Sequence, residues 1–185
     1  MSKRTLAYLV LKSAVLFLSL LCFYPLSATN PQKKEMKELN VKKVSLANVA
    51  VENVPALLDK EKVDFQSINT VNWKAFPYQP EVQFRIAHAD DAILIHYKVK
   101  EASVRAVATG DNGAVWEDAC VEFFSIPAGD GIYYNVECNC VGTLLIGAGG
   151  GRSNREHAPQ EVMDKVQRWS SLGRESFEER RSEER

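Results

Sequence analysis

A tryptophan and several carboxylates lie close together in residues 115–124, which read VWEDACVEFF. After a glycine-containing loop, residues 132–140 add Glu137 and Asn139. An indole can stack on the apolar face of a sugar ring, while carboxylates and amides form hydrogen bonds with the sugar hydroxyls. These residue types therefore favour sugar recognition. The alternative is a core tryptophan surrounded by ordinary surface carboxylates.

Alternation predicts which of these side chains share a face, because successive residues of a strand point to opposite sides. Ala119, Val121 and Phe123 would face the core. The glycines of the loop 127–131 can supply the positive φ that a hairpin needs. If this loop joins 116–124 and 132–140 in register, their polar faces coincide. The resulting exposed patch would contain Trp116, Asp118, Glu122, Asn135, Glu137 and Asn139.

The rest of the chain supplies further strands for such a hairpin. Apolar and polar residues alternate through 82–87 and 93–99, and a short strand is expected at 104–107. A one-turn helix at 55–58 and a short helix within 161–169 are the only helical segments expected. Many short strands separated by turns predict an all-β fold, an antiparallel β-sandwich of the immunoglobulin-like or jelly-roll type.

Composition and the N-terminus limit the function classes. The formal net charge of −1 gives no reason to expect a nucleic-acid partner. Lys3 and Arg4 precede a long apolar run that ends at a small residue, Ala28, which is typical of a secretory signal peptide. An uncleaved membrane anchor is the alternative. Cleavage would leave a net charge of about −4 and no membrane span, and would send the protein to the periplasm, the cell surface or the medium.

The expected organisation has four parts. Residues 1–28 are the signal peptide, 29–43 a polar linker, 44–178 the β-sandwich and 179–185 a charged tail. From Arg174 to Arg185 the chain has four arginines and five glutamates with Phe177 as the only apolar residue, so no strand is expected there.

Metal and thiol chemistry is not expected to carry the function. Cys120, Cys138 and Cys140 are predicted to be free thiols, the last two buried, because the register separates Cys120 from the others. The three histidines, His88, His96 and His157, are predicted to lie at the surface. No cofactor is expected, although oxygen-rich residues offer a possible structural calcium site at Asp111, Asn112 and Asp118.

The stretch at 115–124 resembles the signature strand of carbohydrate-binding module family 9. Several further stretches resemble the family in the same order along the chain: 72–73 with 77–78, 82–87, 104–106, 133–139, 142–145 and 168–173. The resemblance covers residues 40–178. It implies a non-catalytic β-sandwich from an exported glycan-utilisation system that binds oligo- or polysaccharides and often accompanies glycoside hydrolases.

The resemblance also suggests site residues. Trp116 matches a stacking ring and Glu122 a sugar-binding carboxylate, while Arg105, Glu137 and Asn139 lie on matching strands. The family continues past residues 171–177 with further strands and a second stacking tryptophan. The chain is therefore expected to be truncated, with part of the sandwich and one wall of the site missing.

Two other functions remain open from the residues alone. Glu122 and Glu137 could serve as the carboxylate pair of a glycoside hydrolase, whose members need a separation of about 5–5.5 Å or 6.5–9.5 Å. An open sheet face would not desolvate the acid, which argues against catalysis. The other alternative is a structural role in a glycan-processing complex.

Overall fold

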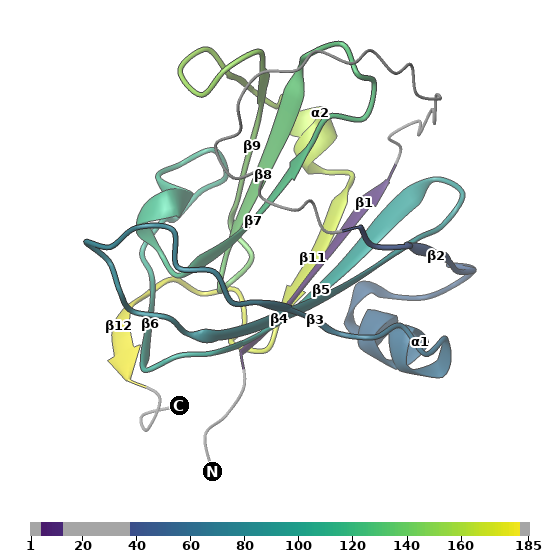
Figure 1. The fold of residues 1–185 in the computed structure, drawn as a ribbon, viewed down its shortest axis with the longest axis horizontal. Helices are drawn as coiled ribbons and strands as arrows, with labels where there is room; N and C mark the ends of the chain where they lie inside the picture. The colour runs from purple at the N-terminus through teal and green to yellow at the C-terminus, as the bar shows by residue number, and fades with distance from the viewer. Residues whose placement is uncertain (1–4, 13–37, 182–185) are drawn as a thin grey trace, which may run out of the picture.

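The computed structural model describes the backbone of residues 5–12 and residues 38–181 in full. Strands are the main regular structure of the described residues, and they form a six-stranded, a four-stranded and a two-stranded sheet (Figure 1). None of the helices among them is long and apolar enough to cross a membrane.

The six-stranded sheet has the order β11-β1-β5-β4-β2, with β3 also paired to β4. The alternation in residues 82–87 and 93–99 predicts two of its strands, and the structure confirms both as the β4–β5 hairpin. In β4, however, the buried residues are Arg85 and Ala87, while the apolar residues that alternate with them are only partly buried. The strands of this sheet are β1 (Thr5–Lys12), β2 (Lys42–Lys43), β3 (Gln66–Ile68), β4 (Glu81–His88), β5 (Ala92–Lys100) and β11 (Val166–Ser170).

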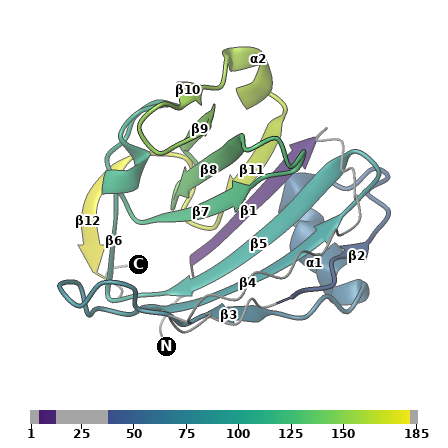
Figure 2. The same cartoon turned by 45° about the horizontal axis from the view of Figure 1, so that its top comes forward.

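The four-stranded sheet, ordered β10-β9-β8-β7, carries the predicted hairpin. Gly129 and Gly131 in its loop have φ values of 67° and 79°, as the hairpin expectation requires. Figure 2 shows this sheet over the strands β1, β5 and β4. Its strands are β7 (Cys120–Ser125), β8 (Tyr133–Asn139), β9 (Leu144–Gly149) and β10 (Glu156–His157).

The predicted core face of the hairpin is confirmed. Val121 and Phe123 of β7 pack against a buried cluster that also contains Val136 and Cys138 of β8 and Ile95 of β5. Side chains of both large sheets therefore meet in one core. Ala119 packs instead in a smaller cluster with Cys140.

The helices are short, and one of them, α1, covers one side of the larger sheet. The 3-10 turn η1 (Val51–Asn53) leads into α1 (Val54–Lys60), which has Pro55 in its first turn and Lys60 in its last, both favourable positions. Val54 and Leu58 of α1 are fully buried against Leu94 of β5 and its neighbours. A second single-turn helix, α2 (Gln160–Met163), precedes β11.

Both ends of the described chain form strands. Thr5–Lys12, within the predicted signal peptide, forms β1 in the interior of the larger sheet. The charged tail was expected to form no strand, but β12 (Phe177–Arg181) pairs with β6 (Ser103–Ala106). Phe177 is buried while the rest of β12 is exposed, so this strand packs on the protein through a single apolar side chain.

His96 was predicted to lie at the surface, and this is wrong. It is 1% exposed on β5, and its Nδ1 accepts a hydrogen bond of 3.0 Å from Arg85 Nε. The Phe65 ring lies edge-on at 5.1 Å. Burial, helped by the charges of Arg85 and Lys98, lowers the pKa of His96 from 6.5 to about 3.

Because this pKa is lower in the folded chain than in the unfolded one, His96 is expected to make stability fall as the solution is acidified. Unfolded chains take up a proton near pH 6.5, whereas folded chains do so only near pH 3. Between pH 8 and pH 5 the free energy of unfolding should drop by about 2 kcal/mol, measured by urea titration. His96→Asn keeps an acceptor for Arg85 and does not titrate. An equal drop in that variant would contradict the assignment.

Candidate functional site

Trp116 lies on a 3-10 turn, η2 (Val115–Glu117), and not on the strand that the sequence predicted. The turn is closed by hydrogen bonds from Glu117 N to Ala114 O and from Asp118 N to Val115 O, both 3.1 Å. Asn112, with φ of 60°, bends the chain just before it. Trp116 is 56% exposed while its neighbour Val115 is fully buried, so the indole is held at the surface by an anchored turn.

Asp118 provides much of that anchoring. Its carboxylate accepts hydrogen bonds from Val107 N at 2.9 Å, Ala108 N at 3.0 Å and Asn139 Nδ2 at 2.9 Å. Its side chain is fully buried, so it does not belong to an exposed patch as predicted. Arg105, a predicted site residue on β6, is half exposed, and its Nε lies 3.9 Å from Asp118 Oδ1.

Asn139, predicted to bind sugar, is fully buried at the end of β8. Besides donating to Asp118, it accepts at Oδ1 from Val141 N at 3.2 Å and from Thr143 N at 2.8 Å. Both ends of its amide are therefore engaged within the protein. Its observed role is to tie the β8–β9 turn to Asp118 and hence to the turn that carries Trp116.

The hairpin places Glu122 of β7 directly opposite Glu137 of β8, as the alternation predicts. Residues opposite each other on antiparallel strands have Cβ atoms about 4.5–5.5 Å apart. Glu122 is exposed to solvent on one side. Its pKa is raised, first because part of the carboxylate is removed from water and second because the Glu137 carboxylate is nearby. Arg155 and Arg152 act in the opposite direction. A hydrogen-bond donor arriving at Glu122 would relieve this repulsion.

Glu137 and Asn135 were expected on an exposed face, but they are 5% and 1% exposed. Glu137 Oε1 accepts a hydrogen bond of 2.5 Å from Asn135 Nδ2. Within the described part of the chain, three buried atoms of this region have no hydrogen-bond partner: Glu137 Oε2, Asn135 Oδ1 and Arg155 Nη1. Each such atom costs about 1–3 kcal/mol. The set contains two acceptors and one donor, which suits hydroxyl groups because they both donate and accept.

Arg155 covers the face of the sheet that carries Asn135 and Glu137, because β9 has glycines on that face and leaves room for the Arg155 side chain. Gly147 lies opposite Asn135, and Gly149 lies opposite Tyr133. A Cβ on Gly147 would lie 3.3 Å from Arg155 Cβ, and one on Gly149 would lie 2.3 Å from Asn154 O. The 152–155 segment therefore packs directly on β9. We call Glu122, Asn135, Glu137 and Arg155 the polar cluster.

The sequence does not readily predict the role of Arg155, because residues 147–151 read GAGGG, which is typical of a flexible loop. Gly147 and Gly149 instead belong to β9. The available signal was their spacing of two, which places both glycines on one face of a strand and leaves room for a neighbouring segment.

Aromatic rings lie near the polar cluster. The Phe124 and Tyr133 rings are 6.1 Å apart, and the guanidinium carbon of Arg155 lies 5.8 Å from the Tyr133 ring. Phe124 is more than half exposed. The β3–β4 loop exposes three more rings, those of Trp73, Phe76 and Tyr78.

A hollow of about 490 Å³ runs along β7, between this strand and the β3–β4–β5 side of the larger sheet. Glu122 and Phe124 line it from β7, and Tyr97 and Val99 line it from β5. Tyr97 donates to the main-chain oxygen of Glu122 at 3.3 Å, and burial strongly raises the pKa of that tyrosine. Glu122 thus lies where the polar cluster meets a mixed apolar and polar hollow.

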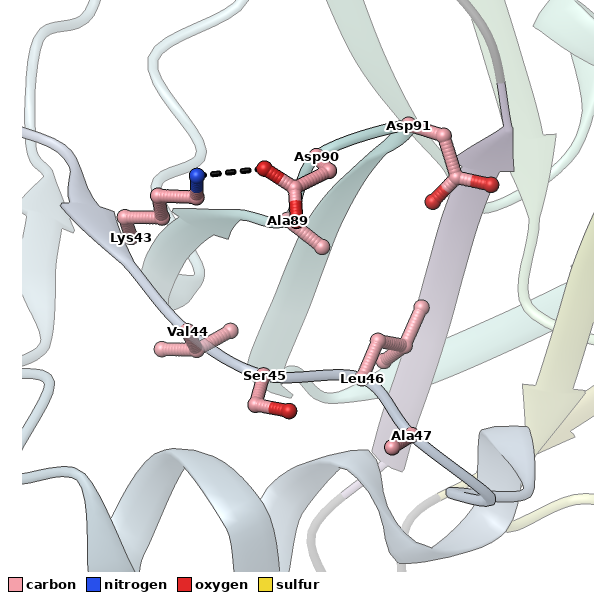
Figure 3. A pocket seen from close by; sticks show the side chains of 8 residues that line it. All are labelled: Lys43, Val44, Ser45, Leu46, Ala47, Ala89, Asp90 and Asp91. Atoms are coloured by element: carbon pink, nitrogen blue, oxygen red, sulfur yellow. Dashed lines mark ion pairs between the residues drawn. The ribbon is translucent and has the colours of Figure 1, made fainter.

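Another hollow, of about 630 Å³, lies between residues 43–47 and the β4–β5 turn. Figure 3 shows Lys43 reaching to Asp90, with which it forms an ion pair. This pair lowers the pKa of Asp90. No aromatic residue lines the hollow, and it shares no residue with the hollow beside β7, so it offers no stacking surface for a sugar.

The carboxylates considered for calcium already bind protein groups. Asp111 pairs with Arg168 through two hydrogen bonds of 2.9 and 2.6 Å, and Asn112 Oδ1 accepts from Ile146 N at 3.3 Å. A cation would have to displace these donors. In residues 38–181 no group of three or more His, Cys, Asp or Glu side chains is arranged to hold a metal ion.

The thiols are free, as predicted. Cys138 and Cys140 are buried, and Cys120 is partly buried opposite Asn139. Burial raises the pKa of Cys120 and of Cys138 to about 12, which leaves both unreactive at neutral pH.

An exposed indole offers a sugar ring a stacking surface, and the carboxylate, amide and guanidinium groups on the strands that follow it offer hydrogen-bond partners for hydroxyls. The sequence profile of carbohydrate-binding family 9 matches residues 52–185, and the chain belongs to this family of non-catalytic modules.

One solved structure is similar over most of the chain. It is that of a "putative carbohydrate-binding protein" from Bacteroides uniformis, with 61% sequence identity and a TM-score of 0.75. The match covers 77% of this chain and 66% of that chain, so the present chain spans just under two thirds of the relative. No curated protein matches the chain.

Proposed function

We propose that this protein binds carbohydrate without modifying it, with a sugar ring stacked on Trp116 and its hydroxyls hydrogen-bonded by Glu122 and the rest of the polar cluster. The observation that carries the proposal is the set of three buried polar atoms without partners in Asn135, Glu137 and Arg155, next to the exposed carboxylate of Glu122. Membership of carbohydrate-binding family 9 supplies the ligand class.

The proposed binding mode divides the predicted residues into two groups. Trp116 and Glu122 are exposed and would contact the sugar directly. Glu137 lies opposite Glu122 on β8 and is buried, so a ligand hydroxyl would reach it by displacing part of the Arg155 side chain. Asn139 would act through Asp118 by holding the turn of Trp116, and Arg105 would border the site beside the same carboxylate.

The proposal includes the architecture and the location of the protein. The two large sheets would form a β-sandwich, supported by the core cluster to which both contribute. The protein would be exported after removal of residues 1–28 and would serve in polysaccharide catabolism, alongside glycoside hydrolases. The basic start and the long apolar run of residues 1–28 support export.

A glycoside hydrolase is the second candidate, favoured by one observation. Glu122 and Glu137 are opposite each other, and the pKa of Glu122 is raised, as is typical of the acid in such a pair. Release of reducing sugar that disappears in Glu122→Gln would support it. We expect no release, because the family is non-catalytic.

Glu122→Gln is expected to weaken oligosaccharide binding by about 10- to 100-fold, because a hydrogen bond to a charged acceptor contributes about 1.5–3 kcal/mol. Isothermal titration calorimetry would measure the affinity. The matched control is Glu117→Gln, another exposed carboxylate, on η2 beside Trp116, which should bind like the native chain. Equal affinity in the Glu122 and Glu117 variants would contradict the proposed role of Glu122.

A further inference from the structure

We propose that the polar cluster recognises an acetamido substituent, so that the ligand is a neutral glycan that contains an N-acetylated hexosamine. The inference rests on the proposed function and deepens it by naming the class of sugar. It is carried by the three buried atoms that lack a hydrogen-bond partner within the described chain, and by the pair of aromatic rings beside them.

One face of the four-stranded sheet brings the acceptors and the rings together. Glu122 is opposite Glu137 across β7 and β8. Next to that pair, Phe124 is opposite Asn135. Opposite residues have Cβ atoms about 4.5–5.5 Å apart, and residues two apart on a strand share a face. Tyr133 therefore lies on the face of Asn135, and its ring is 6.1 Å from that of Phe124. The acceptors thus border the aromatic pair.

Arg155 brings a donor to the same place. A Cβ on Gly147, which is opposite Asn135, would lie 3.3 Å from Arg155 Cβ. The guanidinium carbon of Arg155 lies 5.8 Å from the Tyr133 ring. Arg155 Nη1 is buried and, among the described residues, has no hydrogen-bond partner, as is also true of Glu137 Oε2 and Asn135 Oδ1. A ligand group that satisfies this set must both donate and accept.

The charges around the cluster favour a neutral substituent. Glu122 and Glu137 are negative, while Arg155 and Arg152 are positive and both act on the pKa of Glu122. An ammonium group would be attracted by the carboxylates but repelled by the guanidinium groups, and a carboxylate group would meet the reverse. Charge therefore selects neither sign, and hydrogen-bonding pattern and shape decide.

An acetamido group fits the hydrogen-bonding pattern and the aromatic pair together. Its N–H can donate to Glu137 Oε2 or Asn135 Oδ1, and its carbonyl oxygen can accept from Arg155 Nη1. Its methyl group can contact the Phe124 and Tyr133 rings. A hydroxyl group also donates and accepts, but it leaves these rings without an apolar partner. The second acceptor remains available to a hydroxyl of the same sugar.

Matched sugar pairs test the proposal on the full chain by isothermal titration calorimetry. N-acetyllactosamine is compared with lactose, and N,N′-diacetylchitobiose with cellobiose, because the members of each pair differ only in acetamido against hydroxyl at carbon 2. Chitobiose with free amino groups is a third arm. In each pair that binds, the acetamido sugar should bind about tenfold more tightly or better, because its partner leaves buried polar groups unpaired.

Two arginine variants connect this preference to the cluster. Arg155→Met removes the donor to the acetamido carbonyl, so the ratio of affinities within a pair should fall by about tenfold. Arg152→Met removes the same charge from an exposed position of the same segment and is the matched control, whose ratio should equal that of the native chain. The ratio is the readout because partial unfolding would weaken both members of a pair equally.

Three results would overturn the inference and leave the proposed function standing. They are lactose or cellobiose binding as tightly as its acetamido partner, the free amine binding more tightly than the acetamido sugar, and an unchanged ratio in Arg155→Met. A chain that binds other neutral oligosaccharides but no acetamido sugar would also overturn it. A natively folded chain that binds no sugar at all would instead contradict the proposed function, and the inference with it.

Discussion

Asp118→Ala is expected to lower the free energy of unfolding by about 3–5 kcal/mol, a large effect for a single side chain. The change leaves Val107 N, Ala108 N and Asn139 Nδ2 without their acceptor. It also releases the segment that carries Trp116, so sugar binding should weaken together with stability. Urea unfolding followed by circular dichroism measures the first effect.

The matched control is Asp130→Ala in the β7–β8 loop. Asp130 is exposed and accepts one main-chain hydrogen bond of 3.0 Å, from Ile132 N, so only a small change is expected. Similar unfolding curves for the two variants would show that the buried network around Asp118 does not stabilise this end of the hairpin.

Trp116→Ala is expected to weaken oligosaccharide binding by about 30-fold, or about 2 kcal/mol, without unfolding the chain. The indole is more than half exposed, so its loss removes little core packing. It would remove the stacking surface of the site and the largest ligand-dependent change in tryptophan fluorescence.

Trp73→Ala provides the control for that result. Trp73 is 68% exposed in the β3–β4 loop and is separated in sequence from the polar cluster. Native-like affinity is expected for this variant. If Trp73→Ala abolished binding and Trp116→Ala did not, the stacking surface would lie on the β3–β4 loop.

Local alternation was enough to predict the hairpin and its core face. The register that sets Glu122 opposite Glu137 follows from a period of two and a short glycine loop, both of which are readable in the sequence. The β4–β5 hairpin is predictable for the same reason. The family resemblance named Trp116 and Glu122, and the structure places both at the surface.

The predictions that were wrong concern residues whose positions depend on contacts between distant segments of the chain. Trp116 leaves the strand because Asp118 binds the main chain of residues 107 and 108. Asn135 and Glu137 are buried because Arg155 packs across β9 onto the same face. His96 is buried by Arg85 and Phe65, both outside its own strand. Apart from the spacing of the two glycines in β9, no local sequence pattern predicts these contacts.

Calorimetric titration of the folded, full-length chain with a panel of neutral oligosaccharides, differing in sugar and linkage, tests the central claim most directly. At least one member should give a saturable heat with one sugar site per chain and an accompanying change in tryptophan fluorescence. A chain with native unfolding behaviour that shows no saturable binding to any member at millimolar concentration would contradict the assignment of sugar binding to Trp116 and the polar cluster.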